Sequence, residues 1–174
     1  GMLTTGKDAT ETAMAATITH HAIRIIRDAS TVGRYTSVSA REAFGVEYWP
    51  LELYKLTLAP QEPEFSRLVG LITGAAGGIG CGIARMLVDR GASVVVTDVK
   101  RDEVESFAQE LNQRAGRRKA LGLVMDVTDE ASIERAADEV IRTFGGLDFL
   151  VSNAGIATVA SIDRLSRDAW ERSL

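Results

Sequence analysis

A glycine-rich stretch contains the residues best suited to chemistry: Thr73-Gly74-Ala75-Ala76-Gly77-Gly78-Ile79-Gly80. It follows the apolar residues 68–72 and opens an amphipathic segment that reaches about residue 90. A strand, a glycine turn and a helix in this order form a phosphate cradle, because the first helical turn offers free N–H groups and a positive dipole end. Gly74 allows the tight turn, Gly78 lets backbone approach a pyrophosphate, and Gly80 lets the helix pack closely on the sheet. We therefore predict a dinucleotide-binding turn.

An acidic residue lies where a second strand is expected to end. Residues 93–97 are apolar or β-branched, and Asp98 and Val99 follow them. A carboxylate at this place can accept hydrogen bonds from the ribose hydroxyls of an adenosine, whereas the alternative is a turn residue that caps the strand. A carboxylate also repels a 2′-phosphate, so the sequence favours NAD over NADP. Lys100 and Arg101 lie close enough to weaken that preference.

From about residue 66 onward, short apolar segments alternate with helical patterns, which is typical of parallel βαβ architecture. We expect strands at residues 68–73, 93–97, 120–125 and 149–152, and helices between them. A further helix should begin near residue 166. The helix that starts at Asp129 is predicted to face inward with Ile133, Ala136, Ala137, Val140, Ile141 and Phe144. The fold class is therefore α/β, an incomplete Rossmann doubly wound parallel sheet of about four strands over residues 66–174.

This second region resembles the short-chain dehydrogenase/reductase family. The family's glycine signature matches Thr73, Gly74, Gly78 and Gly80, its Asp-Val pair matches Asp126 and Val127, and its Asn-Ala-Gly motif matches Asn153, Ala154 and Gly155. The resemblance implies that Asp126 and Val127 lie against the adenine and that Gly155 lets the chain pass close to the cofactor. The amide of Asn153 either ties adjacent strand ends together or contacts the cofactor.

Catalysis in this family uses a tyrosine, a lysine four residues later, a serine and an asparagine, which together form a proton relay. The residues four positions after the three tyrosines of this chain are Ser39, Glu52 and Leu58. We therefore assign no catalytic residue, and by register the asparagine would fall beyond Leu174. We expect the NAD-binding part of an oxidoreductase for small alcohol or carbonyl substrates, cut from a longer protein. The alternative is a non-catalytic dinucleotide-binding or interaction module.

Residues 1–65 differ in composition from the rest of the chain and contain all three prolines and all three tyrosines. An amphipathic helix is expected from about residue 8 to residue 28, then a loop or short turns over residues 30–44. The aromatic-rich segment 46–54 that follows is expected to anchor the arm against a neighbouring domain or another chain. Residues 44–56 resemble the junction in bifunctional rhamnulose-1-phosphate aldolase/lactaldehyde dehydrogenase fusions. This resemblance implies that residues 1–65 are the tail of an aldolase domain, without aldolase activity of their own.

The bulk composition excludes several classes of protein. The chain of 174 residues is 45% hydrophobic and 25% charged with a net charge of −4, so it lacks the basic character of a nucleic-acid-binding protein. Its apolar runs are too short to span a bilayer. A single cysteine, Cys81, rules out an internal disulfide, and we expect a cytoplasmic protein.

The sequence also contains two adjacent histidines and one cysteine. His20 and His21 point to different faces of a helix and no other histidine is present, so we expect no metal site. Cys81 is either a thiol whose pKa is depressed by the helix start or a small residue beside the turn. Apolar surface left uncovered on the fourth strand favours a homo-oligomer.

Overall fold

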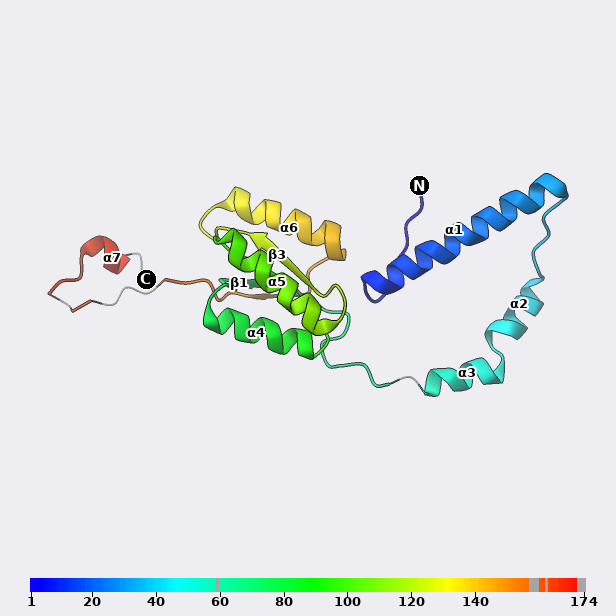
Figure 1. Ribbon diagram of the computed structural model, residues 1–174, viewed down its shortest axis with the longest axis horizontal. Helices are drawn as coiled ribbons and strands as arrows, with labels where there is room; N and C mark the ends of the chain where they lie inside the picture. The colour runs from blue at the N-terminus through cyan, green and yellow to red at the C-terminus, as the bar shows by residue number, and fades with distance from the viewer. Residues whose placement is uncertain (59, 157–159, 162, 172–174) are drawn as a thin grey trace. The chain divides into compact units, whose positions relative to one another are not determined.

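The computed structural model describes residues 1–58, 60–156, 160–161 and 163–171 (Figure 1). It divides into two compact units, Gly1–Glu62 and Pro63–Leu174. No helix in the described ranges is long and apolar enough to cross a membrane.

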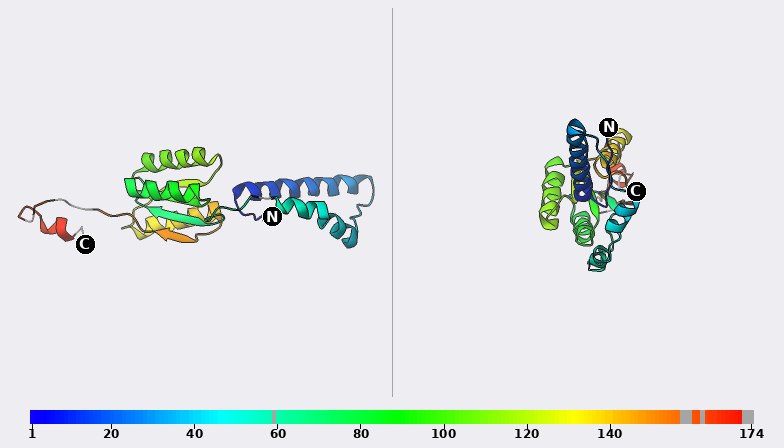
Figure 2. Two further views of the ribbon diagram at one scale, coloured as in Figure 1. Left: turned by 90° about the horizontal axis from the view of Figure 1, so that it is seen from below. Right: turned by 90° about the vertical axis from the view of Figure 1, so that its right-hand side faces the viewer.

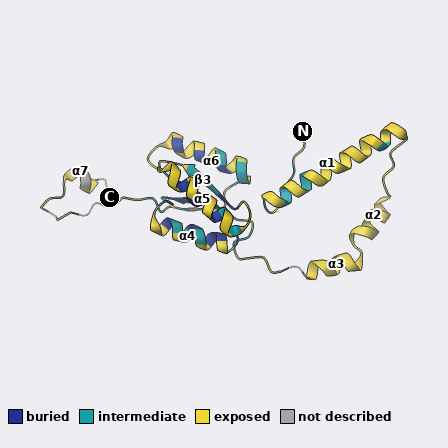
Figure 3. Cartoon of the chain, viewed as in Figure 1, coloured by how far each residue is buried: buried dark blue, intermediate teal, exposed yellow. Residues whose placement is uncertain are grey.

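The first unit consists of three helices that are set by local capping. Helix α1 (Ala9–Val32) begins where the Asp8 carboxylate accepts hydrogen bonds from two backbone amides, α2 (Ala40–Glu47) begins at a Ser39–Glu42 capping box, and α3 (Pro50–Thr57) begins with its proline. No residue of these helices is buried, and Figure 3 shows them in yellow with some teal on α1.

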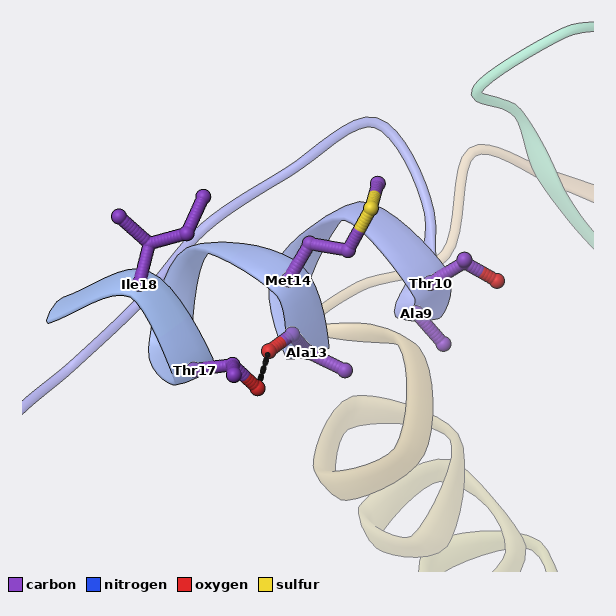
Figure 4. Close-up of a pocket in the computed structure, with 6 residues that line it drawn as sticks. All are labelled: Ala9, Thr10, Ala13, Met14, Thr17 and Ile18. Atoms are coloured by element: carbon purple, nitrogen blue, oxygen red, sulfur yellow. Dashed lines mark hydrogen bonds between the residues drawn. The ribbon is translucent and has the colours of Figure 1, made fainter. Parts of the chain in front are cut away.

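Apolar side chains of this unit are correspondingly exposed. Met14 and Ile18 border a shallow hollow on α1, where the Thr17 hydroxyl donates to the Ala13 carbonyl at 2.9 Å (Figure 4). The rings of Phe44 and Tyr48 lie with centroids 4.5 Å apart, and both side chains are exposed.

The sequence prediction is wrong in detail for this unit. The loop expected over residues 30–44 is too long, because α1 continues to Val32 and α2 starts at Ala40. The Ser39–Glu42 spacing is itself a helix-start signal that the prediction ignored. The aromatic-rich segment 46–54 is divided between α2 and α3, since Pro50 cannot continue a helix but can start one.

The second unit has the predicted doubly wound α/β architecture (Figures 1 and 2). The strands are β1 (Val69–Thr73), β2 (Ser93–Asp98), β3 (Ala120–Val124) and β4 (Phe149–Val151), all parallel and in the order β3-β2-β1-β4. The helices are α4 (Gly78–Asp89), α5 (Arg101–Ala115), α6 (Glu130–Phe144) and α7 (Arg167–Glu171). The order reverses between β1 and β4, which makes this edge of the sheet a topological switch point.

Alternating side chains of the strands supply two cores. On one face, Ile72, Val94 and Val96 pack against α4 and α5. On the other face, Leu71 and Val95 pack against α6. Two helices therefore cover one face, while α6 alone is packed on the other in the described part of the chain.

Helix α6 is less buried than its amphipathic pattern predicts. Ala136 and Val140 are buried, but Ala137 is exposed, and Ile133 and Ile141 are 42% and 56% exposed. The spacing of apolar residues in α6 predicts how wide its apolar stripe is. Burial of the whole stripe also requires another element packed on each side of it. Here the side of the stripe that faces β4 has no helix beside it among the described residues.

A side-chain clamp fixes the start of β3. The Oδ1 atom of Asn112 accepts hydrogen bonds from the backbone amides of Lys119 and Ala120 at 2.6 and 2.8 Å, and its Nδ2 donates to the Ala120 carbonyl at 2.9 Å. The buried Lys119 ammonium donates to the Gly91 carbonyl at 3.0 Å. One amide thus supplies the hydrogen bonds that the first strand residue needs.

Replacing Asn112 with alanine should therefore destabilise the second unit. We expect Asn112→Ala to lower the free energy of unfolding by about 2–3 kcal/mol, because two backbone donors lose their acceptor. Urea denaturation followed by circular dichroism measures this loss. The exposed neighbour Gln113→Ala is the control and should change stability by less than about 0.5 kcal/mol. Equal losses in the two variants would contradict the clamp.

Candidate functional site

A hollow of about 580 Å³ lies where the strands end at the switch point. It is lined by Gly74, Asp98, Val99, Met125, Asp126, Val127, Thr128, Ala154, Gly155 and Ile156. These residues come from the segments that follow all four strands, so the fold brings four separately predicted sequence segments together. Carboxyl ends of parallel strands at a switch point are where ligands bind in open α/β sheets.

Two positions of the turn must be glycine, because neighbouring atoms lie too close to leave room for a Cβ. Gly74 has a φ of +63°, and a Cβ there would lie 2.8 Å from the Ala154 Cα. A Cβ on Gly80 would lie 2.7 Å from the Gly74 carbonyl oxygen and 2.9 Å from the Asn153 amide nitrogen. The close packing predicted for Gly80 is thus against the glycine turn and the segment after β4.

The start of α4 is open. Gly77 is its N-cap, no side chain caps it, and its first turn carries no acidic residue. Every other described helix has an acidic residue in its first turn. A Cβ on Gly78 would meet nothing within 4 Å, and Ile79 is 75% exposed. The first turn of α4 therefore has neither a capping side chain nor an acidic residue that would compete with an anion for its N–H groups.

Asp98 is the last residue of β2 and lines the hollow. Its carboxylate accepts hydrogen bonds from the backbone amides of Ala76 at 3.3 Å and Lys100 at 3.4 Å. The two nearby cations are engaged, since Lys100 pairs with Glu103 at 2.9 Å and Arg101 pairs with Glu105 at 3.0 Å. The hydrogen bond to Glu103 raises the pKa of Lys100. The charged side chain that lines this part of the hollow is thus the Asp98 carboxylate, while Lys100 and Arg101 are not among the lining residues.

Asp126 forms a local turn after β3. Its Oδ1 accepts hydrogen bonds from the Thr128 amide at 2.9 Å and the Thr128 hydroxyl at 2.7 Å, and both lower the pKa of Asp126. Its backbone amide donates to the Ser132 hydroxyl at 3.1 Å. This turn leaves Val127 45% exposed as an apolar wall of the hollow.

Thr73 and Asn153 hold the ends of β1 and β4 together. The buried Thr73 hydroxyl accepts hydrogen bonds from the amides of Asn153 at 2.9 Å and Ala154 at 2.8 Å. The Asn153 side chain donates to the carbonyls of Thr73 at 2.9 Å and Gly74 at 3.1 Å. Asn153 does not line the hollow, and of the two roles considered the structure shows the tie between strand ends.

Three lining residues were not predicted from the sequence. Thr128 had a readable signal, because an aspartate two residues before a threonine commonly closes a local turn. Met125 and Ile156 had no such signal, since only the sheet places them at the hollow.

The thiol of Cys81 does not take the activated form that was one of its two interpretations. Its Sγ donates a hydrogen bond to the Ala75 carbonyl at 3.0 Å, and burial raises its pKa. The carbonyl contact also favours the protonated thiol. Cys81 is therefore a small residue packed beside the glycine turn.

A raised pKa makes Cys81 slow to alkylate. The thiolate is the reactive form, so its reaction rate with iodoacetamide should still be rising at pH values where an ordinary thiol, with a pKa of about 8.5, has levelled off. Mass spectrometry of the single cysteine measures the rate at each pH. The urea-unfolded chain is the control and should level off earlier. A folded-state midpoint at or below that of the unfolded chain would contradict this prediction.

Comparisons with known proteins agree with this geometry. Residues 69–174 match the family model described as short chain dehydrogenase, and residues 1–56 match the model described as aldolase class II, second domain. An uncharacterized oxidoreductase, YuxG of Bacillus subtilis, is 40% identical over 174 residues, which are 100% of this chain and 25% of that protein. D-threitol dehydrogenase of Mycolicibacterium smegmatis is 39% identical over 106 residues, 61% of this chain and 40% of that protein.

Two solved structures from Brucella melitensis are similar to the chain. A short-chain dehydrogenase/reductase of the glucose/ribitol dehydrogenase type has a TM-score of 0.57 at 31% identity, over 65% of this chain and 46% of that one. A 3-ketoacyl-(acyl-carrier-protein) reductase complexed with NADH has a TM-score of 0.54 at 32% identity, over 61% and 42%. The chain thus spans less than half the length of the relatives it matches. With the parallel sheet, the glycine turn and the family match over residues 69–174, the chain belongs to the short-chain dehydrogenase family.

Proposed function

We propose that residues 66–174 bind NAD and are the cofactor-binding part of a dehydrogenase for small alcohols or aldehydes. The observation that carries this proposal is the open first turn of α4, with Gly78 facing free space, next to a hollow that contains Asp98. NAD, when bound, supplies the acceptor for a hydride. A relative named D-threitol dehydrogenase and a neighbour complexed with NADH support both the cofactor class and the alcohol class of substrate.

The residues of the site fit a dinucleotide. The N–H groups of Gly78, Ile79 and Gly80 can bind a pyrophosphate, and Gly77 leaves their approach open. The Asp98 carboxylate can accept hydrogen bonds from ribose hydroxyls, and Val99 lies beside it.

Another part of the hollow is lined by Val127, Ala154 and Gly155. These residues leave room for a flat apolar ring and let a ligand approach the backbone. The exposed Val127 can pack against an adenine, while Asp126 holds the turn that presents it. Ala154 and Gly155 add little side-chain bulk on the segment after β4. Asn153 keeps that segment against the glycine turn rather than reaching into the hollow.

The residues that would carry hydride transfer remain unassigned. All three tyrosines lie in residues 1–62, so no tyrosine–lysine pair belongs to the described part of the second unit. This is also the observation that favours a second candidate, a dinucleotide-binding module without catalysis. Formation of NADH from NAD and a small alcohol or lactaldehyde by the gene product separates the candidates. NAD binding without NADH formation would support the module.

The aldolase match over residues 1–56 supports a further part of this proposal. We interpret residues 1–65 as the tail of an aldolase domain that precedes the dehydrogenase part in a fused protein. Lactaldehyde, which the resemblance to such fusions implies, is our proposed substrate for the dehydrogenase part.

Charge at the start of α4 should control cofactor affinity. Gly78→Asp puts a carboxylate where we place the pyrophosphate, so titration calorimetry should show NAD binding about tenfold weaker. The fold should tolerate the change, because the side chain enters free space and an acidic residue favours a helix start. Gly78→Asn has nearly the same shape without the charge and should retain most of the affinity. No heat from NAD at millimolar concentration with the parent chain would overturn the proposed function.

The carboxylate of Asp98 should set the choice between NAD and NADP. Asp98→Asn removes the charge that repels a 2′-phosphate, so the ratio of the NADP to the NAD dissociation constant should fall by about tenfold. Calorimetric titration with each dinucleotide gives this ratio. Asp102→Asn, an exposed carboxylate in the first turn of α5, is the control and should leave the ratio unchanged. A ratio that moves equally in both variants would show only a general effect of charge.

A further inference from the structure

A hydrogen-bonded turn of three residues follows β3 at the hollow where the strands end. Asp126, Val127 and Thr128 all line this hollow and are exposed. We call residues 126–128 the Asp126 turn. The Asp126 Oδ1 atom accepts two hydrogen bonds from Thr128, one from its backbone amide at 2.9 Å and one from its hydroxyl at 2.7 Å. Thr128 therefore contributes a side chain as well as a backbone group to the turn.

The backbone of the Asp126 turn has anchors that do not involve the Thr128 hydroxyl. The Met125 amide donates a hydrogen bond to the Asp98 carbonyl at 3.0 Å, at the end of β2. The Asp126 amide donates to the hydroxyl of the buried Ser132, in α6, at 3.1 Å. These contacts hold the chain to both β2 and α6. The hydroxyl of Thr128 is thus not needed to keep the turn in place.

What the hydroxyl adds is a fixed orientation of the Asp126 carboxylate. A hydroxyl that donates to a carboxylate at 2.7 Å makes a short, charge-assisted hydrogen bond. Threonine is β-branched and stiff at χ1, so its hydroxyl is held in place. The two hydrogen bonds from Thr128 also lower the pKa of Asp126, which keeps the carboxylate charged near neutral pH. Among the described residues, the hydrogen bonds to this carboxylate all fall on Oδ1, which leaves Oδ2 for a ligand.

We propose that Thr128 is a positioning residue for the dinucleotide, because its hydroxyl holds Oδ1 of Asp126 and thereby sets the direction of Oδ2. This proposal rests on the NAD binding proposed above. A carboxylate oxygen can only accept a hydrogen bond, so Oδ2 favours a base that offers a donor to it. Adenine has an amino group at its 6-position, whereas hypoxanthine has a carbonyl oxygen there. The Thr128 hydroxyl thus acts on the choice of base through Asp126.

A carboxylate that is held in place before binding raises affinity, because less side-chain freedom is lost when the ligand arrives. Without the hydrogen bond from the hydroxyl, the Asp126 side chain would sample several χ1 rotamers, and not all of them direct Oδ2 at the base. Removing the hydroxyl should therefore weaken the binding of an adenine dinucleotide about fivefold. A dinucleotide whose base offers no donor to Oδ2 should lose little affinity.

Titration calorimetry of the 174-residue chain with two dinucleotides tests the proposal. NAD carries adenine, and nicotinamide hypoxanthine dinucleotide differs from it at the 6-position of the base. Thr128→Val removes the hydroxyl but keeps the branched shape, so NAD should bind about fivefold more weakly while binding of the hypoxanthine analogue stays nearly unchanged. Thr128→Ser retains a hydroxyl and should keep most of the NAD affinity. Equal changes for the two dinucleotides in Thr128→Val, or no change in either, would overturn the proposal.

Thr143→Val is the matched control. The Thr143 hydroxyl donates to the Glu139 carboxylate at 3.4 Å within α6, and neither residue lines the hollow. Loss of this threonine–carboxylate hydrogen bond should leave both dissociation constants unchanged. If Thr128→Val loses its circular dichroism signal, Thr128→Ala replaces it with the same expected result. No heat from either dinucleotide with the parent chain would overturn the proposed function itself, and this proposal with it.

A double-mutant cycle shows whether the hydroxyl acts through Asp126. In an Asp126→Ala background the carboxylate is absent, so Thr128→Val should have no further effect on the affinity for NAD. A further loss as large as the one in the parent would mean that the hydroxyl binds the ligand directly, and would contradict a positioning role.

Discussion

The hydrogen bonds between Thr73 and Asn153 are the constraint on which the site depends. They join the end of β1, the glycine turn and the segment after β4 through four short contacts. Because this junction is so tight, Gly74 and Gly80 have no room for a Cβ. The junction fixes where α4 starts relative to the sheet, and hence where its free N–H groups lie. A dinucleotide site in this fold is therefore held by polar contacts between strand ends.

The charged and capping groups around this junction determine where an anion can bind. Asp8 and Ser39 cap their helices, and α4 has no comparable group. The positive end of α4 is thus left for a ligand, and because its N-cap is glycine the cost in helix stability is only about a few tenths of a kcal/mol. Asp98 stands at the neighbouring strand end, and the adjacent cations are paired with glutamates. An anion is favoured at one place and disfavoured a short distance away, which is consistent with the proposed preference for NAD over NADP.

Much of this arrangement can be predicted from the sequence because its signals are local. The four strands, the glycine turn and Asp98 are each marked by a few adjacent residues. The parallel direction of the strands follows from the alternation of strands and helices. The exposure of Ile133 and Ile141 cannot be predicted in this way, because it depends on which helices lie beside α6. Met125 and Ile156 reach the hollow only through the sheet. The start of α2 was missed despite a local signal at Ser39.

Met125 and Val127 line both the hollow at the strand ends and the apolar hollow of about 650 Å³ on the α6 face of the sheet. These two side chains are therefore a partition shared by two compartments, and an occupant on either side restricts their motion. Whatever free energy one occupant contributes by ordering this partition lowers the cost of ordering it for the other. Thermodynamic linkage requires the effect to be equal in both directions. Packing on the far face of the sheet would thereby change the affinity for a dinucleotide bound in the hollow at the strand ends, without touching it.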